Sequence, residues 1–213
     1  MKAVLLCAGS GTRLGDLTKD LPKSLLTIAG KTIVEYQLEL LKNIGITDVY
    51  INLHHCADQI KDHLGNGKKF GMKIKYFYED EPSGTAGGVK CFEKELAMEE
   101  NFVVFYGDIV TKQSLQPLIE KHLSKKALAT IFVHQRSHSN SLIQFDAEGK
   151  VQSFLERPSK EQIENSTIRA QDRWVNSAIY CFHRDILKLI PQNQNSDFPK
   201  DIFPLILAQH RLY

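Results

Sequence analysis

The stretch AGSGTRLGDLTKDLPKSLL near the N-terminus combines small residues with cations in a pattern suited to binding phosphate. It follows an apolar run, residues 3–8, which has the length of a buried strand. Gly9 and Gly11 come next and would let backbone N–H groups approach an anion. Arg13 and Lys23 add two positive charges beside the same loop. The stretch therefore predicts a loop that binds a polyphosphate.

Two common nucleotide-binding loops do not fit this stretch. The dinucleotide fingerprint needs a third glycine at the position of Leu14, and the P-loop needs a Gly-Lys-Ser/Thr segment that is absent here. Leu14 therefore disfavours a dinucleotide-dependent oxidoreductase.

Asp108 is a candidate magnesium ligand. It follows an apolar strand, residues 102–106, so its carboxylate should emerge where α/β sheets place their ligands. Mg²⁺ is typically bound by one or two protein carboxylates together with phosphate oxygens and water. A helix cap is the structural alternative for Asp108. The glycine-rich segment 84–88 likewise either lets a flat base lie against backbone amides or only packs tightly on the sheet.

Five segments together resemble the sugar-1-phosphate nucleotidylyltransferases, or NDP-sugar pyrophosphorylases, over nearly the whole chain. The segments are AGSGTR with the later PK pair, EPSGTAGG, YGD, FLERP and VNS, in the order found in that family. The resemblance implies transfer of a nucleoside monophosphate from a nucleoside triphosphate to a sugar 1-phosphate, with Mg²⁺ as cofactor. The products would be pyrophosphate and an NDP-sugar. Nucleotide-sugar and cell-surface polysaccharide biosynthesis are the processes that the resemblance implies.

The identity of the base is less constrained by the sequence. The segment EPSGTAG is most similar to members that use GTP with mannose- or heptose-1-phosphate. Cytidylyl, uridylyl or thymidylyl transfer to another sugar phosphate or to phosphocholine stays open. A non-catalytic regulatory protein that binds nucleotide sugars is the alternative from a different functional class.

The resemblance also implies roles for individual residues. Arg13 would bind the departing pyrophosphate, Lys23 would neutralise the α-phosphate region, and Asp108 would bind Mg²⁺; these three form the catalytic set. Arg157 stands where a lysine is usual in the family, and arginine keeps the charge but differs in reach. The implied nucleotide-binding residues are Ala8, Gly9, Ser10, Gly11, Thr12, Arg13, Lys23, Glu81, Gly84, Thr85, Ala86 and Gly107, and the implied sugar-phosphate-binding residues are Glu156, Arg157 and Asn176.

This chemistry needs no general base, because the phosphate nucleophile is already an anion near neutral pH. Charge neutralisation, in-line positioning and a divalent metal are what such an enzyme supplies. The sequence accordingly shows no Ser/His/Asp or Cys/His arrangement, and His54, His55, His134 and His138 are interpreted as loop or surface residues.

A second metal-binding aspartate is usual in the family beyond the last helix expected here. The chain ends at Tyr213, about where that segment should begin. We therefore expect one nucleotidylyltransferase domain, residues 1–213, with either a missing C-terminal segment or a different handling of the metal. Asp197 and Asp201 precede an apolar helix and are expected to cap it.

Alternating strands and helices are expected to position these motifs. Thr32-Ile33-Val34-Glu35 is a capping box that begins a helix ending near Gly45. Repeated strand–helix units predict a Rossmann-like three-layer α/β/α sandwich with a mixed, mostly parallel sheet. The expected strands are 48–53, 73–78, 102–106, 128–133, 142–145, 151–154 and 174–182, and further helices are expected at 57–64, from about 84, at 115–123 and at 197–207.

The composition is that of an ordinary globular protein, with 213 residues, 42% hydrophobic and 24% charged, and a net charge of +2. Basic pairs are isolated, so no nucleic-acid partner is expected. Four cysteines lack C-x-x-C spacing, which disfavours zinc and redox sites. No signal peptide or membrane span is indicated, so the expectation is a cytoplasmic protein without a membrane partner. The oligomeric state stays open, with a homo-oligomer among the options.

Overall fold

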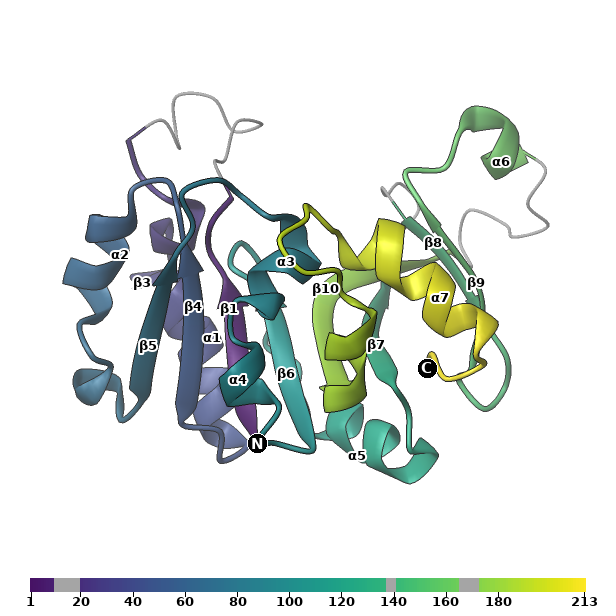
Figure 1. Cartoon of the computed structure of the whole chain (residues 1–213), viewed down its shortest axis with the longest axis horizontal. Helices are drawn as coiled ribbons and strands as arrows, with labels where there is room; N and C mark the ends of the chain where they lie inside the picture. Colours follow the sequence, from purple (N-terminus) through teal and green to yellow (C-terminus); the bar gives the residue numbers. More distant parts are fainter. Residues whose placement is uncertain (10–19, 137–140, 165–172) are drawn as a thin grey trace.

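A mixed sheet of eight strands forms the centre of the computed structural model, which describes residues 1–9, 20–136, 141–164 and 173–213 (Figure 1). Among these residues the strand order is β5-β4-β1-β6-β10-β8-β9, and β7 also pairs with β10. The strands are β1 (Lys2–Leu6), β4 (Asp48–Leu53), β5 (Lys73–Tyr78), β6 (Asn101–Tyr106), β7 (Ala129–Gln135), β8 (Ser141–Phe145), β9 (Val151–Glu156) and β10 (Trp174–His183).

The sheet has a parallel half and an antiparallel half. Strands β5, β4, β1 and β6 run parallel, so their carboxyl ends meet at one edge. Strand β10 runs antiparallel to β6, and β8 and β9 form the expected hairpin. The predicted fold class is therefore confirmed, with the parallel half carrying the loops that the sequence assigned to nucleotide binding.

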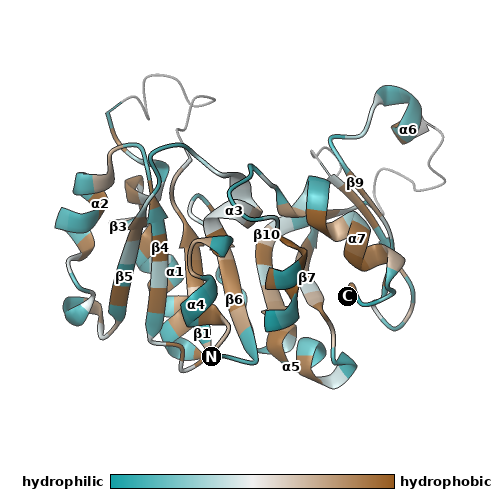
Figure 2. Cartoon of the chain, in the orientation of Figure 1, coloured by the Kyte–Doolittle hydropathy of each residue, from teal (hydrophilic) through white to brown (hydrophobic). Residues whose placement is uncertain are grey.

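Helices cover both faces of the sheet, because alternate residues of each strand point to opposite faces (Figure 1). One apolar cluster joins the sheet to α1 (Ile33–Asn43), α2 (Ala57–Leu64) and α5 (Gln116–Lys125). The other joins it to α3 (Gly84–Lys90), α4 (Glu93–Leu96) and α7 (Phe203–Ala208). In Figure 2 the central strand β6 is mostly brown, whereas the edge strand β5 and the helices alternate teal and brown, because the sheet is buried on both faces only at its centre.

Several short elements lie outside these layers. They are the ribbon strands β2 (Thr27–Ile28) and β3 (Lys31–Thr32), helix α6 (Lys160–Glu164), the 3₁₀ turns η2 (Lys23–Leu25), η3 (Lys68–Phe70) and η5 (Arg184–Leu189), and the π-helical turn η6 (Phe198–Ile202). No helix in the described ranges has the length and apolar character that crossing a bilayer requires.

The N-terminus of α1 follows the predicted capping box. The Thr32 side chain accepts a hydrogen bond from the Glu35 amide, and the Glu35 carboxylate accepts one from the Thr32 amide at 2.7 Å. This local motif fixes where α1 begins, and hence which of its residues face the sheet.

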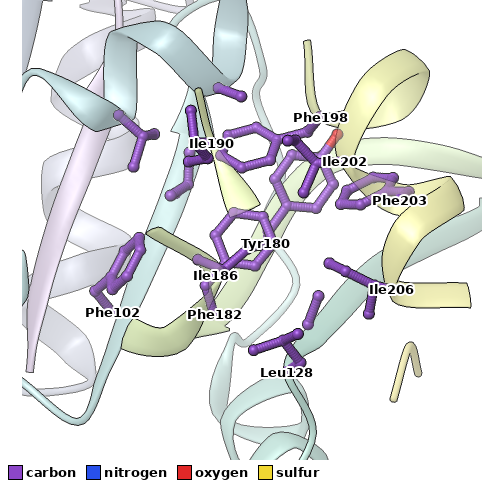
Figure 3. Close-up of a cluster of buried hydrophobic side chains, with 14 of the residues drawn as sticks. Phe102, Leu128, Tyr180, Phe182, Ile186, Ile190, Phe198, Ile202, Phe203 and Ile206 are labelled. Atoms are coloured by element: carbon purple, nitrogen blue, oxygen red, sulfur yellow. The ribbon is translucent and has the colours of Figure 1, made fainter. Parts of the chain in front are cut away.

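The final helix predicted over 197–207 is confirmed as a continuous helical segment over 198–208, but its first turn is π-helical. A π-helical turn, η6, precedes α7. Pro204 has no N–H to donate, so a regular α-helical ladder cannot continue through it. A buried aromatic cluster holds the segment against β10: the rings of Phe182 and Phe198 have centroids 4.7 Å apart, and those of Tyr180 and Phe203 are 5.3 Å apart (Figure 3).

Candidate active site

A cavity of about 260 Å³ lies at the carboxyl ends of β1, β4, β5 and β6, beside the N-terminus of α3. Open α/β sheets place their ligands at this edge. Among the described residues that line the cavity, Lys23 is the one cation, and Glu79, Asp108 and Asp197 are carboxylates. The cavity is thus lined by side chains of both charges.

Lys23 and Asp108 form an ion pair in this cavity. The Lys23 Nζ lies 3.1 Å from the Asp108 Oδ2, and the two side chains are 17% and 40% exposed. Lys23 comes from η2 and Asp108 from the turn after β6, so 85 residues of chain separate two groups that meet here. The pair leaves part of the carboxylate open to the cavity.

Gly107 sets the position of Asp108 relative to β1. Its amide donates to the Leu6 carbonyl at 2.8 Å. A Cβ at this position would come within 2.7 Å of the Cys7 Sγ and 2.8 Å of the Leu6 oxygen, so a side chain cannot be accommodated. The turn after β6 therefore packs directly on the end of β1, where the predicted phosphate-binding loop begins.

Glu79 is a buried carboxylate that holds two neighbouring loops. Its Oε1 accepts from the Asn52 amide at 2.5 Å, and its Oε2 accepts from the backbone and the hydroxyl of Ser83 at 2.8 and 2.6 Å. The Asn52 Oδ1 accepts in turn from the Cys7 amide at 2.8 Å. These bonds tie the ends of β1, β4 and β5 to the start of α3.

The start of α3 is also fixed by a distant part of the chain. The Asp197 Oδ1 accepts from the Thr85 amide at 2.9 Å and from its hydroxyl at 3.0 Å. Asp197 therefore caps α3 and makes no side-chain bond to its own helix, contrary to the sequence prediction. The Asp201 Oδ2 accepts from the Asp197 amide at 2.7 Å, as expected for a residue near that helix start.

The glycine at the start of α3 is required by the backbone. Gly84 has φ +80, and a Cβ there would lie 2.5 Å from the Ser196 carbonyl oxygen. That carbonyl accepts from the Ala86 amide at 2.8 Å. Gly84 thus allows close approach of another backbone. Packing on the sheet, one of the two alternatives that the sequence left open, occurs at Gly88, where a Cβ would lie 3.1 Å from the Leu6 Cδ2 of β1.

A second polar group lies beyond Tyr106, toward β9 and β10. The Asn176 Nδ2 donates to the Tyr180 hydroxyl at 2.7 Å, and its Oδ1 accepts from the Ala178 amide at 2.9 Å. Burial raises the pKa of both Tyr106 and Tyr180, and the nearby Glu156 carboxylate adds to this effect. The Tyr106 hydroxyl lies near those of Thr85 and Tyr180 but makes no hydrogen bond of standard geometry with a described residue.

The structure brings together part of the predicted site. The predicted residues lining the cavity are Ala8, Gly9, Lys23, Gly84, Thr85, Gly107 and Asp108. Five other predicted residues do not line the cavity: Glu81, Ala86, Glu156, Arg157 and Asn176. Three of them are exposed, namely Glu81, Glu156 and Arg157. Ser10, Gly11, Thr12 and Arg13 lie outside the described residues, so their roles stay predictions.

Sequence reasoning missed Asn52 and Glu79, which line the cavity, and assigned Asp197 only a cap of its own helix. Asn52 lies near the end of β4 and Glu79 directly follows β5, so the strand-end argument applied to Asp108 could have found both. The contact of Asp197 with Thr85 spans 112 residues and leaves no local signal.

Nucleophilic or multi-ligand metal chemistry gains no support from the described residues. Burial raises the pKa of the Cys7 thiol to about 12, so it is not a reactive thiolate. No group of three or more His, Cys, Asp or Glu side chains in the described ranges is arranged to hold a metal. Among the described residues, Asp108 fits the role of a Mg²⁺ ligand, because it presents a partly exposed hard oxygen ligand to the cavity.

Comparison with known proteins gives consistent matches. Residues 2–213 match the family model described as Nucleotidyl transferase. A UTP–glucose-1-phosphate uridylyltransferase of Synechocystis is 30% identical over 97% of this chain and 55% of its own length. A probable mannose-1-phosphate guanylyltransferase 1 of Oryza sativa is 31% identical over the whole chain and 58% of its own length, so the chain spans little more than half of each of these relatives.

A solved structure shows the same fold. The crystal structure of HddC from Yersinia pseudotuberculosis complexed with GMP-PN is 26% identical, with a TM-score of 0.75 over 95% of this chain and 85% of that one.

Proposed function

Because the chain belongs to the nucleotidyl transferase family, we propose that it transfers a nucleoside monophosphate from a nucleoside triphosphate to a sugar 1-phosphate. The observation that carries the proposal is the pairing of Lys23 with Asp108 in a cavity at the carboxyl edge of the parallel strands. A cation beside a partly open carboxylate suits a site where phosphates must be brought together. We treat residues 1–213 as one nucleotidylyltransferase domain.

The reaction joins two phosphates that repel one another. An oxygen of the sugar 1-phosphate attacks the α-phosphorus, a new P–O bond forms, and the bond from that phosphorus to the bridging oxygen of pyrophosphate breaks. Pyrophosphate leaves with the electron pair, and no side chain has to remove a proton. Lys23 lowers the barrier by neutralising charge at the α-phosphate, and we assign the departing pyrophosphate to Arg13.

Asp108 would hold Mg²⁺, which supplies charge neutralisation and orientation of the phosphates when bound. The Lys23 ammonium keeps the Asp108 carboxylate directed at the cavity, and Gly107 keeps it close to β1. Glu156, Arg157 and Asn176 are the proposed groups for the sugar phosphate. The observation that supports this assignment is the hydrogen bond from Asn176 to the Tyr180 hydroxyl, beside Tyr106.

For the base we propose guanine. The printed names of similar proteins include a mannose-1-phosphate guanylyltransferase and a complex with GMP-PN. Mannose- or heptose-1-phosphate is the proposed acceptor.

A panel assay tests this proposal. The chain is mixed with Mg²⁺, each of four nucleoside triphosphates and a set of sugar 1-phosphates with phosphocholine included, and pyrophosphate is measured. We expect release that requires GTP and a mannose- or heptose-type phosphate. Turnover with UTP, CTP or dTTP alone would refute the guanine assignment, and triphosphate binding with no turnover across the panel would favour a regulatory binding protein.

A further inference from the structure

Gln37 is a fully buried polar residue that the proposed chemistry does not use. It lies in the middle of α1 on the face that also buries Val34, Leu38 and Leu41, and its exposed fraction is 0%. An amide placed in an apolar layer costs free energy unless its groups are hydrogen-bonded. Its bonds therefore need an explanation.

The Gln37 amide holds the turn that carries Asp108. Its Nε2 donates to the Tyr106 carbonyl at 2.9 Å and to the Ile109 carbonyl at 2.8 Å. These two carbonyls flank Gly107 and Asp108 in the chain. The Ile109 amide also donates to the Tyr106 carbonyl at 3.2 Å and closes the turn. One side chain thus bridges both ends of a four-residue turn.

This arrangement leaves the other half of the amide unsatisfied. The Gln37 Oε1 is buried and has no hydrogen-bond partner among the described residues. A buried acceptor without a partner lowers the stability of the fold. Rotating the amide by half a turn would not help, because the oxygen would then face two carbonyl oxygens. An apolar side chain at this position would avoid the cost of an unpaired oxygen. The two bonds that Gln37 donates therefore explain why an amide is present here.

The turn has three supports, and Gln37 provides the one on the side of α1. On the side of β1, Gly107 donates to Leu6 with no room for a side chain. In the cavity, Lys23 bonds the Asp108 carboxylate itself. Without Gln37 the Ile109 end of the turn loses its bond to α1, so the direction of the carboxylate is less tightly fixed.

We propose that Gln37 is a positioning residue for Asp108, acting through the backbone of the turn to hold the carboxylate in the direction that binds the divalent cation. The proposal rests on the proposed function, which gives Asp108 its metal role. Residues that orient a metal ligand typically change metal affinity about 10- to 100-fold when removed. We expect the lower end of that range, because Gly107 and Lys23 still restrain the turn.

The test compares the unaltered 213-residue chain with Gln37→Met, which keeps the length of the side chain and removes both donors. Mn²⁺ is titrated into each protein without nucleotide, and the broadening of NMR signals from residues 107–109 gives its dissociation constant. Hydrogen exchange of the same amides is measured in parallel. Asp108→Asn is the control for loss of the ligand.

His122→Leu is the matched control for loss of a buried polar side chain. His122 is 1% exposed and bonds Thr130 at 2.9 Å and Asn101 at 3.0 Å, outside the turn. We expect Gln37→Met to raise the Mn²⁺ dissociation constant about tenfold and to speed exchange in the turn. His122→Leu should leave both unchanged while lowering stability.

The outcomes separate the two proposals. Mn²⁺ binding in the unaltered chain that is equally tight in Gln37→Met would overturn the role of Gln37 alone. Equal weakening in His122→Leu would also overturn it, because general destabilisation would then be the cause. No broadening near Asp108 in the unaltered chain would contradict its metal role and the positioning proposal with it. Should Gln37→Met not fold, the unaltered chain still decides: rapid exchange of the Gln37 side-chain amide protons would contradict the two bonds.

Discussion

Replacing Lys23 with alanine should separate catalysis from stability. As an ion pair, Lys23 and Asp108 contribute about 1 kcal/mol or less to folding, because Asp108 is 40% exposed and solvent screens the pair. For a chain of this size that corresponds to a fall in Tm of about 2–4 °C at most. A group that neutralises charge in the transition state is worth about 3–4 kcal/mol, or a factor of about 10²–10³ in kcat.

The assay is pyrophosphate release at saturating substrates, beside thermal unfolding of the same preparations. Lys31→Ala is the matched control, because Lys31 forms an ion pair with Glu39 whose side chains are 48% and 53% exposed, and neither residue lines the cavity. We expect Lys23→Ala to lose about two to three orders of magnitude in kcat with a small change in Tm, and Lys31→Ala to lose neither. An unchanged kcat in Lys23→Ala would refute the catalytic assignment.

Three further predictions concern other groups of the structure. Asp108→Asn should abolish the Mg²⁺ dependence of turnover together with turnover, because an amide is a poor ligand for a hard cation; a wild-type response to Mg²⁺ would make Asp108 structural. Asp197→Ala removes the acceptor for the Thr85 amide and hydroxyl, a cap worth about 1 kcal/mol. The KM for the triphosphate should therefore rise roughly fivefold with kcat little changed. Asp197→Asn should restore the KM, because its side-chain oxygen still accepts. Burial lowers the pKa of His122 from 6.5 to about 4, so folding favours its neutral form. The free energy of unfolding should therefore be highest above pH 6.5 and fall by about 3 kcal/mol as the pH drops to 4. Urea unfolding of His122→Leu should lack this pH-dependent part.

Local patterns predicted the fold well because its elements begin and end on local signals. The capping box at Thr32 and the turn 146–149 between β8 and β9 both lie where the sequence indicated. The final helix was also predicted, because its apolar residues keep helical spacing. The π-helical pattern of its first turn was not predicted: Pro204 lacks an N–H for a regular α-helical ladder, and the ring packing against β10 is a long-range contact that no short window of sequence contains.

The site was predictable where a strand end carries a charged residue, as at Asp108. Gln37 could not be identified in this way, because its position in α1 resembles an ordinary polar interruption of a helix. Its role appears only when the turn 106–109 is placed beside it, across about 70 residues of chain. Groups that position other groups depend on such long-range contacts, so sequence patterns indicated cavity-lining residues such as Asp108 better than the residues that support them.

In the proposed reaction, a sugar-phosphate oxygen attacks the α-phosphorus of the triphosphate at the Lys23–Asp108 site. The most direct test is ³¹P NMR of a reaction with GTP and mannose 1-phosphate labelled with ¹⁸O in its non-bridging phosphate oxygens. We expect a GDP-sugar with ¹⁸O in the bridge between its two phosphorus atoms and unlabelled pyrophosphate, and we expect Lys23→Ala to lose both products. Label in pyrophosphate, or pyrophosphate formed without the sugar phosphate, would contradict the proposed reaction.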